Sequence, residues 1–543
     1  MKKISIISCF CIGLMLIQSC KKATLEVSNL NQPTTDVLNT EAGVISYSKG
    51  FYKIGFGDQG VGSLDDGLGY GMQLIVLGFH ESMGDNIFIP WGNNSYKFAD
   101  NPQWVKLDNG TTVNNPIGQG QKYELKLRNN RAYGASNSFL PEWTYMYFLN
   151  NAANVLLSKV DGTAFSGDAV AKKNILKAWA YWWKGYAYCR LGSMYIAGII
   201  AETPNTTNGN FVTNTAMVTE GIKNLDKATA ILTPLTSAGT YNELMTQVIP
   251  GYMQKSGIPP SPNEWVSNIN TFKARSILVN KKVADMTGAD WTTVKGLTDN
   301  GIGPTDYAFG VRTFSDNAKS TIDKDYGSTG SYTATDDPTF WPSERLIQDY
   351  KAGDKRLANN FNLLGSAVIN KRGRSITFGT RYYLKDGGND NGAIVYFHFD
   401  YGVDNLYIGG SYEENLLMKA ECLIQTSQID AGVTIINTVR TVQGAGISSP
   451  MGLTKSAALE ELRKERRCAL FLRGLAFYDA RRNGITDDVS LGGGRNGCVV
   501  LDASGNVNTN CQINYKYLPF WDVPQNELDF NAPAQGSAPI KTL

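Results

Sequence analysis

Two polar stretches of the chain gather the residue types that suit the hydroxyl groups and apolar faces of a ligand. The first, DNIFIPWGNNSYKF, has no helical apolar stripe and contains Trp91, Asn93, Asn94 and Tyr96. The second, residues 291–341, contains Trp291, Tyr307, Tyr326, Tyr332 and Trp341. Flat aromatic rings pack against the C–H side of a sugar ring, and amides bond its hydroxyl groups. These residues are therefore candidates to contact a ligand; the alternative is that the loops pack on the scaffold.

Residues that could catalyse a reaction are sparse. His80 and His398 are the two histidines, and the chain has no HExxH, GxSxG or Cys-His zinc spacing. A glycoside hydrolase needs two carboxyl groups roughly 5–10 Å apart. The adjacent acids that could supply them are Asp65-Asp66, Asp336-Asp337 and Glu413-Glu414. Adjacent acids in polar surroundings are commonly solvated, so we predict structural histidines, solvated acids and no enzymatic activity.

Two further patterns resemble a cofactor site and a metal site. Residues 55–60, GFGDQG, match the dinucleotide pattern G-x-G-x-x-G. That pattern must open a helix whose N-terminus faces a pyrophosphate, and the glycines that follow at 62, 67, 69 and 71 disfavour a helix. Asp323, Asp325 and Gly327 could hold a calcium ion through carboxylate and backbone oxygens. We predict no cofactor; a calcium ion bound at the second pattern remains an alternative.

The N-terminus has the form of a lipoprotein export signal. Two lysines precede an apolar run over residues 4–17 that is too short to cross a bilayer comfortably. The run ends in Leu-Ile-Gln-Ser-Cys, which resembles a bacterial lipobox, so cleavage before Cys20 would leave its thiol diacylated. Each buried CH₂ contributes roughly 0.8 kcal/mol, and several acyl chains hold a protein stably on a membrane. We predict residues 1–19 as the signal peptide and 20–39 as a tether; an ordinary cleaved signal is the alternative.

The net charge indicates which partners are disfavoured, and the cysteine contexts indicate which thiols are free and which could pair. Loss of residues 1–19 removes two lysines and lowers the formal net charge from +2 to zero, so nothing favours nucleic acid. Cys189, Cys422 and Cys468 lie in apolar helical contexts and are expected to be buried free thiols. Cys498 and Cys511 flank a polar Gly/Asn loop in an exported chain, which favours a disulfide between them.

Most of the remaining chain has helical periodicity. Helices are predicted over about 40–53, 72–83, 138–160, 168–196, 216–232, 271–287, 412–426 and 429–442. A longer helix is predicted over 459–485, where six arginines accompany the apolar face. Residues 375–385 and 393–400 alternate apolar and polar types around DGGNDNG, which predicts a β-hairpin. Trp179, Trp182 and Trp183 lie in a strong helix and are expected in the core.

Four motifs recur in a fixed order along the chain. They are the lipobox with its Asn/Pro/Thr tether, SYEENLLMKAECLIQ with its continuation INTVR, the arginine-rich stretch 459–485, and LPFWDVPQNEL near the end. Together they resemble the SusD/RagB family of outer-membrane, nutrient-binding lipoproteins. The arginine-rich stretch departs from the family pattern, because Ala469 and Arg473 stand where Glu is usual and Ala476 where Arg is usual.

That resemblance implies a mostly α fold, in which helix pairs of tetratricopeptide type form a scaffold and irregular loops form a binding face. It implies one domain over 40–543, with binding loops at about 55–131 and 233–341. It also implies a non-catalytic, lipid-anchored protein of the outer-membrane surface that captures an oligosaccharide or polysaccharide for a SusC-like TonB-dependent transporter. The alternatives are a surface glycoside hydrolase and a helical-repeat scaffold for peptide or protein partners.

Overall fold

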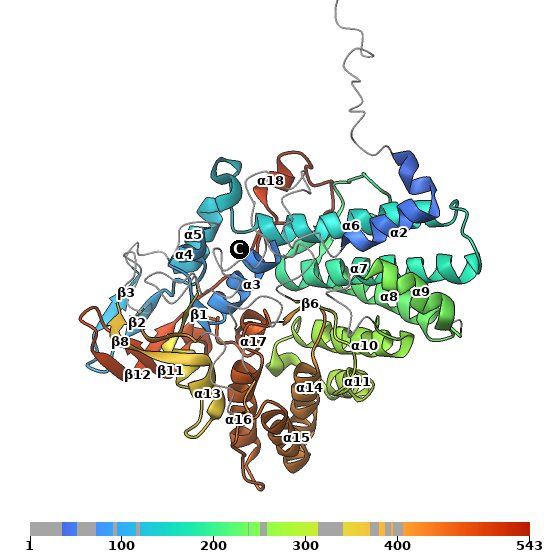
Figure 1. Cartoon of the computed structure of the whole chain (residues 1–543). Helices are drawn as coiled ribbons and strands as arrows, with labels where there is room; N and C mark the ends of the chain where they lie inside the picture. Colours follow the sequence, from blue (N-terminus) through green and yellow to red (C-terminus); the bar gives the residue numbers. More distant parts are fainter. Residues whose placement is uncertain are drawn as a thin grey trace, which may run out of the picture.

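The computed structural model describes residues 35–51, 72–90, 95–115, 120–236, 238–249, 258–312, 340–369, 379–385, 392–394 and 405–542. The fold is mostly helical with a few small sheets, as predicted (Figure 1). The longer helices of the first half are α2 (Glu41–Gly50), α3 (Met72–Met83), α6 (Leu140–Val160), α7 (Ala169–Met194), α8 (Asn214–Leu232), α9 (Ala238–Val248), α10 (Pro262–Leu278) and α11 (Gly288–Asp299). Those of the second half are α14 (Tyr412–Gln425), α15 (Ile429–Val442), α16 (Lys455–Ala469) and α17 (Ala476–Arg482).

Short helical segments connect these elements. They are η2 (Thr35–Asn39), α4 (Tyr96–Ala99), α5 (Gly120–Arg128), η5 (Arg131–Ser136), η7 (Val283–Asp285), α12 (Glu344–Ile347), α13 (Lys355–Asn360), η11 (Val489–Leu491) and α18 (Gln525–Leu528). Successive long helices pack in pairs, α6 with α7, α7 with α8, α10 with α11 and α14 with α15. This pairing is the scaffold that the periodicity predicts.

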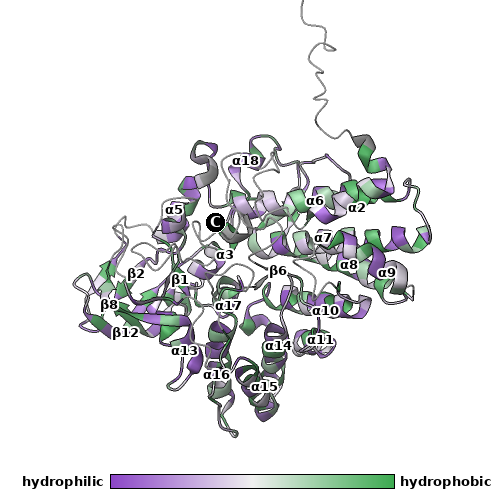
Figure 2. Cartoon of the chain, viewed as in Figure 1, coloured by the Kyte–Doolittle hydropathy of each residue, from purple (hydrophilic) through white to green (hydrophobic). Residues whose placement is uncertain are grey.

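The core is richest in aromatic side chains around α7. Trp179, Trp182 and Trp183 are fully buried, which confirms the prediction, and the whole second half of this helix is enclosed. The backbones of α7 and α8 approach closely, since a Cβ added at Gly185 would lie 2.5 Å from the Leu225 side chain. Both polar and apolar residues contribute to α7, and its hydropathy is mixed along its length (Figure 2). Burial of an all-round surface, rather than a single stripe, explains that pattern.

The described strands are short, and three of their seven pairings join strands that are distant in sequence. One sheet has the order β11 (Arg495–Leu501), β12 (Val507–Asn514), β2 (Trp104–Lys106) and β3 (Thr112–Asn114). The two-stranded pairs are β1 (Ile87–Phe88) with β7 (Trp341–Pro342), β4 (Ala197–Ile199) with β5 (Phe211–Thr213), β6 (Gly310–Arg312) with β10 (Asn405–Tyr407), and β8 (Phe361–Val368) with β9 (Thr380–Leu384). Every one of these pairings is antiparallel.

Two predicted helices differ from the structure, and one predicted strand has an unexpected partner. The helix expected over 459–485 is broken into α16 and α17, because Leu472 and Gly474 adopt the left-handed backbone at φ +58° and +70°. The strand expected over 375–385 pairs, as β9, with the preceding strand β8, which the sequence did not predict; the second strand of the expected hairpin, over 393–400, lies mostly outside the described part, so the hairpin stays a prediction. The helix expected over 271–287 begins earlier, at Pro262, because Ser261 and Glu264 form a capping box there.

Candidate ligand-binding face and its arginine anchor

Five of the nine residues predicted to contact a ligand lie outside the described part of the chain. They are Trp91, Asn93, Asn94, Tyr326 and Tyr332. The glycine-rich motif at 55–60, the calcium pattern at 323–327 and His398 lie outside it as well. Their predicted roles therefore stay predictions.

The other four predicted residues are buried, in contrast to the expectation that they face a ligand. Tyr96, Trp291, Tyr307 and Trp341 are only 6%, 5%, 5% and 3% exposed. The Tyr96 hydroxyl donates a hydrogen bond of 3.0 Å to the Ile75 carbonyl, and burial raises the pKa of Tyr96 well above its usual value. For these four side chains the packing alternative is the correct one, because an aromatic ring must present a free face to stack on a sugar.

The short pair β1–β7 brings the described ends of the two aromatic stretches together. Phe88 lies opposite Trp341 and Ile87 opposite Pro342 in the antiparallel register. The Phe88 and Trp341 rings stack at 6.3 Å between centroids, with planes 12° apart. In an antiparallel pair the chain leaves one strand at the end where it enters the other. Residues 89–90 and residue 340 are therefore neighbours, and residues 91–94 and 313–339 connect directly to them.

A second short pair holds the other end of the 313–339 segment. Strand β6, which ends at Arg312, pairs with β10 in the register Leu406 to Val311. Arg473 lies in the linker between α16 and α17, and its guanidinium is 3.8 Å from the centroid of the Tyr407 ring in β10. Both ends of this segment thus connect to elements that contact the broken arginine-rich region.

Arg467 of α16 ties β1 to the residues that follow β7. Its guanidinium donates to the Asp85 carbonyl at 2.6 Å and to Asn86 Oδ1 at 3.0 Å, just before β1. It also donates to the Arg345 carbonyl at 2.6 Å and to Asp349 Oδ2 at 2.5 Å, just after β7. The side chain is 7% exposed. One buried guanidinium therefore ties the flanks of both strands together.

Asp85 is the second tie between the same two strands. It accepts hydrogen bonds from the Arg345 guanidinium, at 2.8 Å from Nη2, and from the Ser343 hydroxyl at 2.9 Å. The Tyr515 hydroxyl also donates to it. Burial favours the neutral acid, but the charge and hydrogen bonds of Arg345 prevail and hold the pKa of Asp85 well below its usual range. Asp85 is consequently ionised at neutral pH.

The sequence interpretation missed this ion-pair network. Glu460 and Asp479 of the stretch 459–485 pair with its arginines, but two further acids are distant in sequence: Asp349 pairs with Arg463 and Arg467, and Glu421 with Arg482. The only local signal was the density of arginines. Buried arginines require counter-charges, so that density indicated distant acids without naming them.

Other single-residue predictions have mixed outcomes. His80 is structural as predicted, fully buried with its Nε2 3.1 Å from Glu142 Oε2, and burial lowers its pKa. Glu414 was expected to be solvated, which is wrong: it is buried and pairs with Arg275 through Nε at 2.6 Å. A carboxylate held in this way is not available to a glycosidase reaction.

The five described cysteines are free and buried. For Cys189, Cys422 and Cys468 this confirms the expectation. Cys498 and Cys511 are opposite one another in the β11–β12 register, so their predicted pairing has a suitable backbone.

Within the residues described, no group of three His, Cys, Asp or Glu side chains gathers to hold a metal ion. Over the same residues, no helix is both long and apolar enough to cross a membrane.

The fold is similar to that of SusD-like structures. A SusD-like carbohydrate binding protein from Bacteroides vulgatus ATCC 8482 covers 92% of this chain and 98% of its own, with 13% identity and a TM-score of 0.57. One from Bacteroides fragilis NCTC 9343 covers 91% and 99%, with 15% identity and a TM-score of 0.56. A third structure, described as with xylogluco-oligosaccharide, covers 92% and 99%, with 13% identity and a TM-score of 0.55.

The sequence comparisons agree with this class. The SusD family model matches residues 412–534, which contain α14 to α18. No curated protein matches the chain. Residues 412–534 match the SusD family and the described fold is that of SusD-like structures, so the family resemblance that the motifs predicted is confirmed at the level of this match and of the fold.

Proposed function

We propose that this protein binds an oligosaccharide at the face where residues 91–94 and 313–339 leave the β1–β7 pair. The pairing of β1 with β7 carries this proposal, because it connects the two aromatic-rich segments at one place. A single stacking contact contributes about 0.5–1.5 kcal/mol, so useful affinity needs rings from both segments. One structure of the same fold is described as with xylogluco-oligosaccharide, which supports a saccharide as the ligand class.

The lipobox and the family resemblance complete the proposed role. Cys20 carries the lipid anchor in the outer membrane, and the protein delivers its glycan to a SusC-like TonB-dependent transporter without chemical conversion. The absence of catalytic motifs from the sequence and the ion pair that occupies Glu414 support a binding role over a glycoside hydrolase. The Cys20→Ser variant should move from the membrane fraction to the soluble fraction; retention in the membrane would contradict the anchor.

Calorimetry and affinity electrophoresis of the purified protein across a panel of polysaccharides test the binding. Trp91→Ala should weaken binding of the recognised glycan about fivefold or more, since it removes one stacking surface. Phe530→Ala is the matched control, because Phe530 is an exposed aromatic residue, at 77%, of the C-terminal segment. If no saccharide binds, or if both variants weaken binding equally, the proposed face is wrong.

A further inference from the structure

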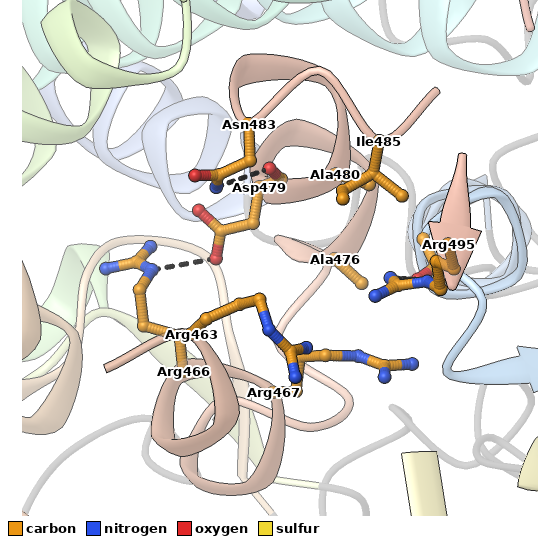
Figure 3. A pocket seen from close by; sticks show the side chains of 10 residues that line it. Arg463, Arg466, Arg467, Ala476, Asp479, Ala480, Asn483, Ile485 and Arg495 are labelled. Carbon is orange, nitrogen blue, oxygen red and sulfur yellow. Dashed lines mark hydrogen bonds and ion pairs between the residues drawn. The ribbon is translucent and has the colours of Figure 1, made fainter. Parts of the chain in front are cut away.

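A small pocket beside the anchor is lined mainly by arginines. Four of them, Arg463, Arg466, Arg467 and Arg495, surround it, and Asp479 is the only acid in its wall. Three of these arginines come from α16 and the fourth from the start of β11 (Figure 3). The pocket has an empty volume of about 340 Å³, part of it open to solvent, and no aromatic side chain lines it. A sugar would find no stacking surface here.

Several acids near the pocket are shared between two arginines each. Asp349 pairs with both Arg463 and Arg467. Asp479 pairs with Arg466 and Arg482. Asp85 pairs with Arg345 at 2.8 Å and more distantly with Arg495, at 3.8 Å. Two further acids, Glu421 and Glu460, pair with Arg482 and Arg463. Together these ion pairs contain six guanidinium groups and five carboxylates, and the unmatched guanidinium is in the group of Asp85, Arg345 and Arg495.

Two arginines of the pocket have a nitrogen that makes no hydrogen bond, although Arg495 Nε lies 3.8 Å from Asp85 Oδ2. The Arg466 side chain is 6% exposed, and its Nη1 has no hydrogen-bond acceptor although its Nε donates to Asp479 at 2.8 Å. The Nε of Arg495 likewise has no acceptor, and its Nη2 reaches the Gly84 carbonyl only at 3.4 Å. A buried charged donor without an acceptor is costly, so these two arginines are less well satisfied than Arg463 and Arg467.

The electrostatic field around the pocket is also positive. Burial and the nearby charge of Arg495 lower the pKa of Arg467, although Asp349 and Asp85 oppose this. Glu81 lies behind Arg467, but burial raises its pKa to about 7, so it carries only part of a charge at neutral pH. The positive charge of the pocket is thus incompletely compensated.

We propose that this pocket binds a free tetrahedral oxyanion, phosphate or sulfate, independently of the glycan. Guanidinium groups bind such anions through paired, charge-assisted hydrogen bonds. Donors that approach from α16 and from β11 suit an anion with oxygens in several directions better than a planar carboxylate. The anion would add a negative charge beside these guanidinium groups and stabilise the folded protein by mass action.

Titration calorimetry and thermal unfolding of the purified full chain test this site with sodium phosphate, sodium sulfate and sodium chloride at matched ionic strength. We expect a saturable rise in the melting temperature with phosphate or sulfate and a binding heat that chloride does not produce. Sulfate and phosphate also stabilise proteins generally by exclusion from their surfaces, but that effect does not saturate. A rise that is unsaturable and produces no binding heat would overturn the proposal.

Substitutions locate the site. Arg466→Met should weaken anion binding by about tenfold or more, the loss expected for one charge-assisted hydrogen bond. Asn483→Asp, which adds a negative charge at an exposed position of the pocket wall, should also weaken it and spares the buried network if Arg466→Met fails to fold. The control is Lys223→Met, which removes an exposed positive charge on α8. Equal affinity in Asn483→Asp and the control would refute this location.

Discussion

Replacement of Arg467 by Met removes the guanidinium that joins the flanks of β1 and β7. The change leaves the Asp85 and Arg345 carbonyls without this donor and deprives Asp349 of one of its two arginines. Removal of one partner from a buried ion pair costs about 3–5 kcal/mol. Asp349 retains Arg463, and repulsion from Arg495 is relieved, so we expect a loss of about 3 kcal/mol, at the lower end of that range.

Urea unfolding followed by tryptophan fluorescence measures this loss. Arg463→Met is the matched control, since Arg463 lies one helical turn earlier and also pairs with Asp349, but its side chain is 27% exposed. Partly exposed pairs contribute about 0–1 kcal/mol. Arg467→Met should also weaken glycan binding, because it releases both segments of the proposed face, whereas the control should not. Equal losses below about 1 kcal/mol in both variants would refute the role of Arg467 as an anchor.

Three further predictions concern acid stability, redox state and backbone conformation. Burial opposes ionisation of Asp349, but Arg467 and Arg463 lower its pKa to about 2. The ionised carboxylate therefore stabilises the folded protein by about 2 kcal/mol, fully above about pH 4, and this contribution is lost as the pH falls through 2. The urea midpoint should consequently fall less between pH 5 and pH 2 in Asp349→Asn than in the unsubstituted protein. Without reductant, Cys498 and Cys511 should form a disulfide that adds about 3 kcal/mol, and peptide mapping that finds both thiols alkylated after denaturation would contradict it. Gly474→Ala should lose about 1–2 kcal/mol because its φ is +70°, whereas Gly296→Ala, in the open middle of α11, should gain about 0.5–1 kcal/mol by the same urea assay.

Local signals in the sequence predicted the helices well and the long-range pairings not at all. Helix α14 was expected over 412–426 and is found over Tyr412–Gln425, because the Ser411 side chain caps it by accepting from the Glu414 amide. The strands β1 and β7 have two residues each, which is too short for any alternation to be visible. Likewise, the burial of Tyr96 and Trp341 depends on elements distant in sequence. The family motifs predicted the fold, but they did not determine which aromatic side chains are free.

The break within 459–485 is what creates the arginine pocket. In a continuous helix, residues 466 and 479 would be about 20 Å apart along the axis, too far for any contact. In the structure the Arg466 Nε lies 2.8 Å from Asp479 Oδ2, because the chain reverses between α16 and α17. The left-handed backbone of Leu472 costs about 1–2 kcal/mol, which is offset by burial of that side chain and by the bond from the Gly474 amide to Glu81. The arginine density is therefore a property of this turn: it brings more guanidinium groups together than the nearby carboxylates can neutralise.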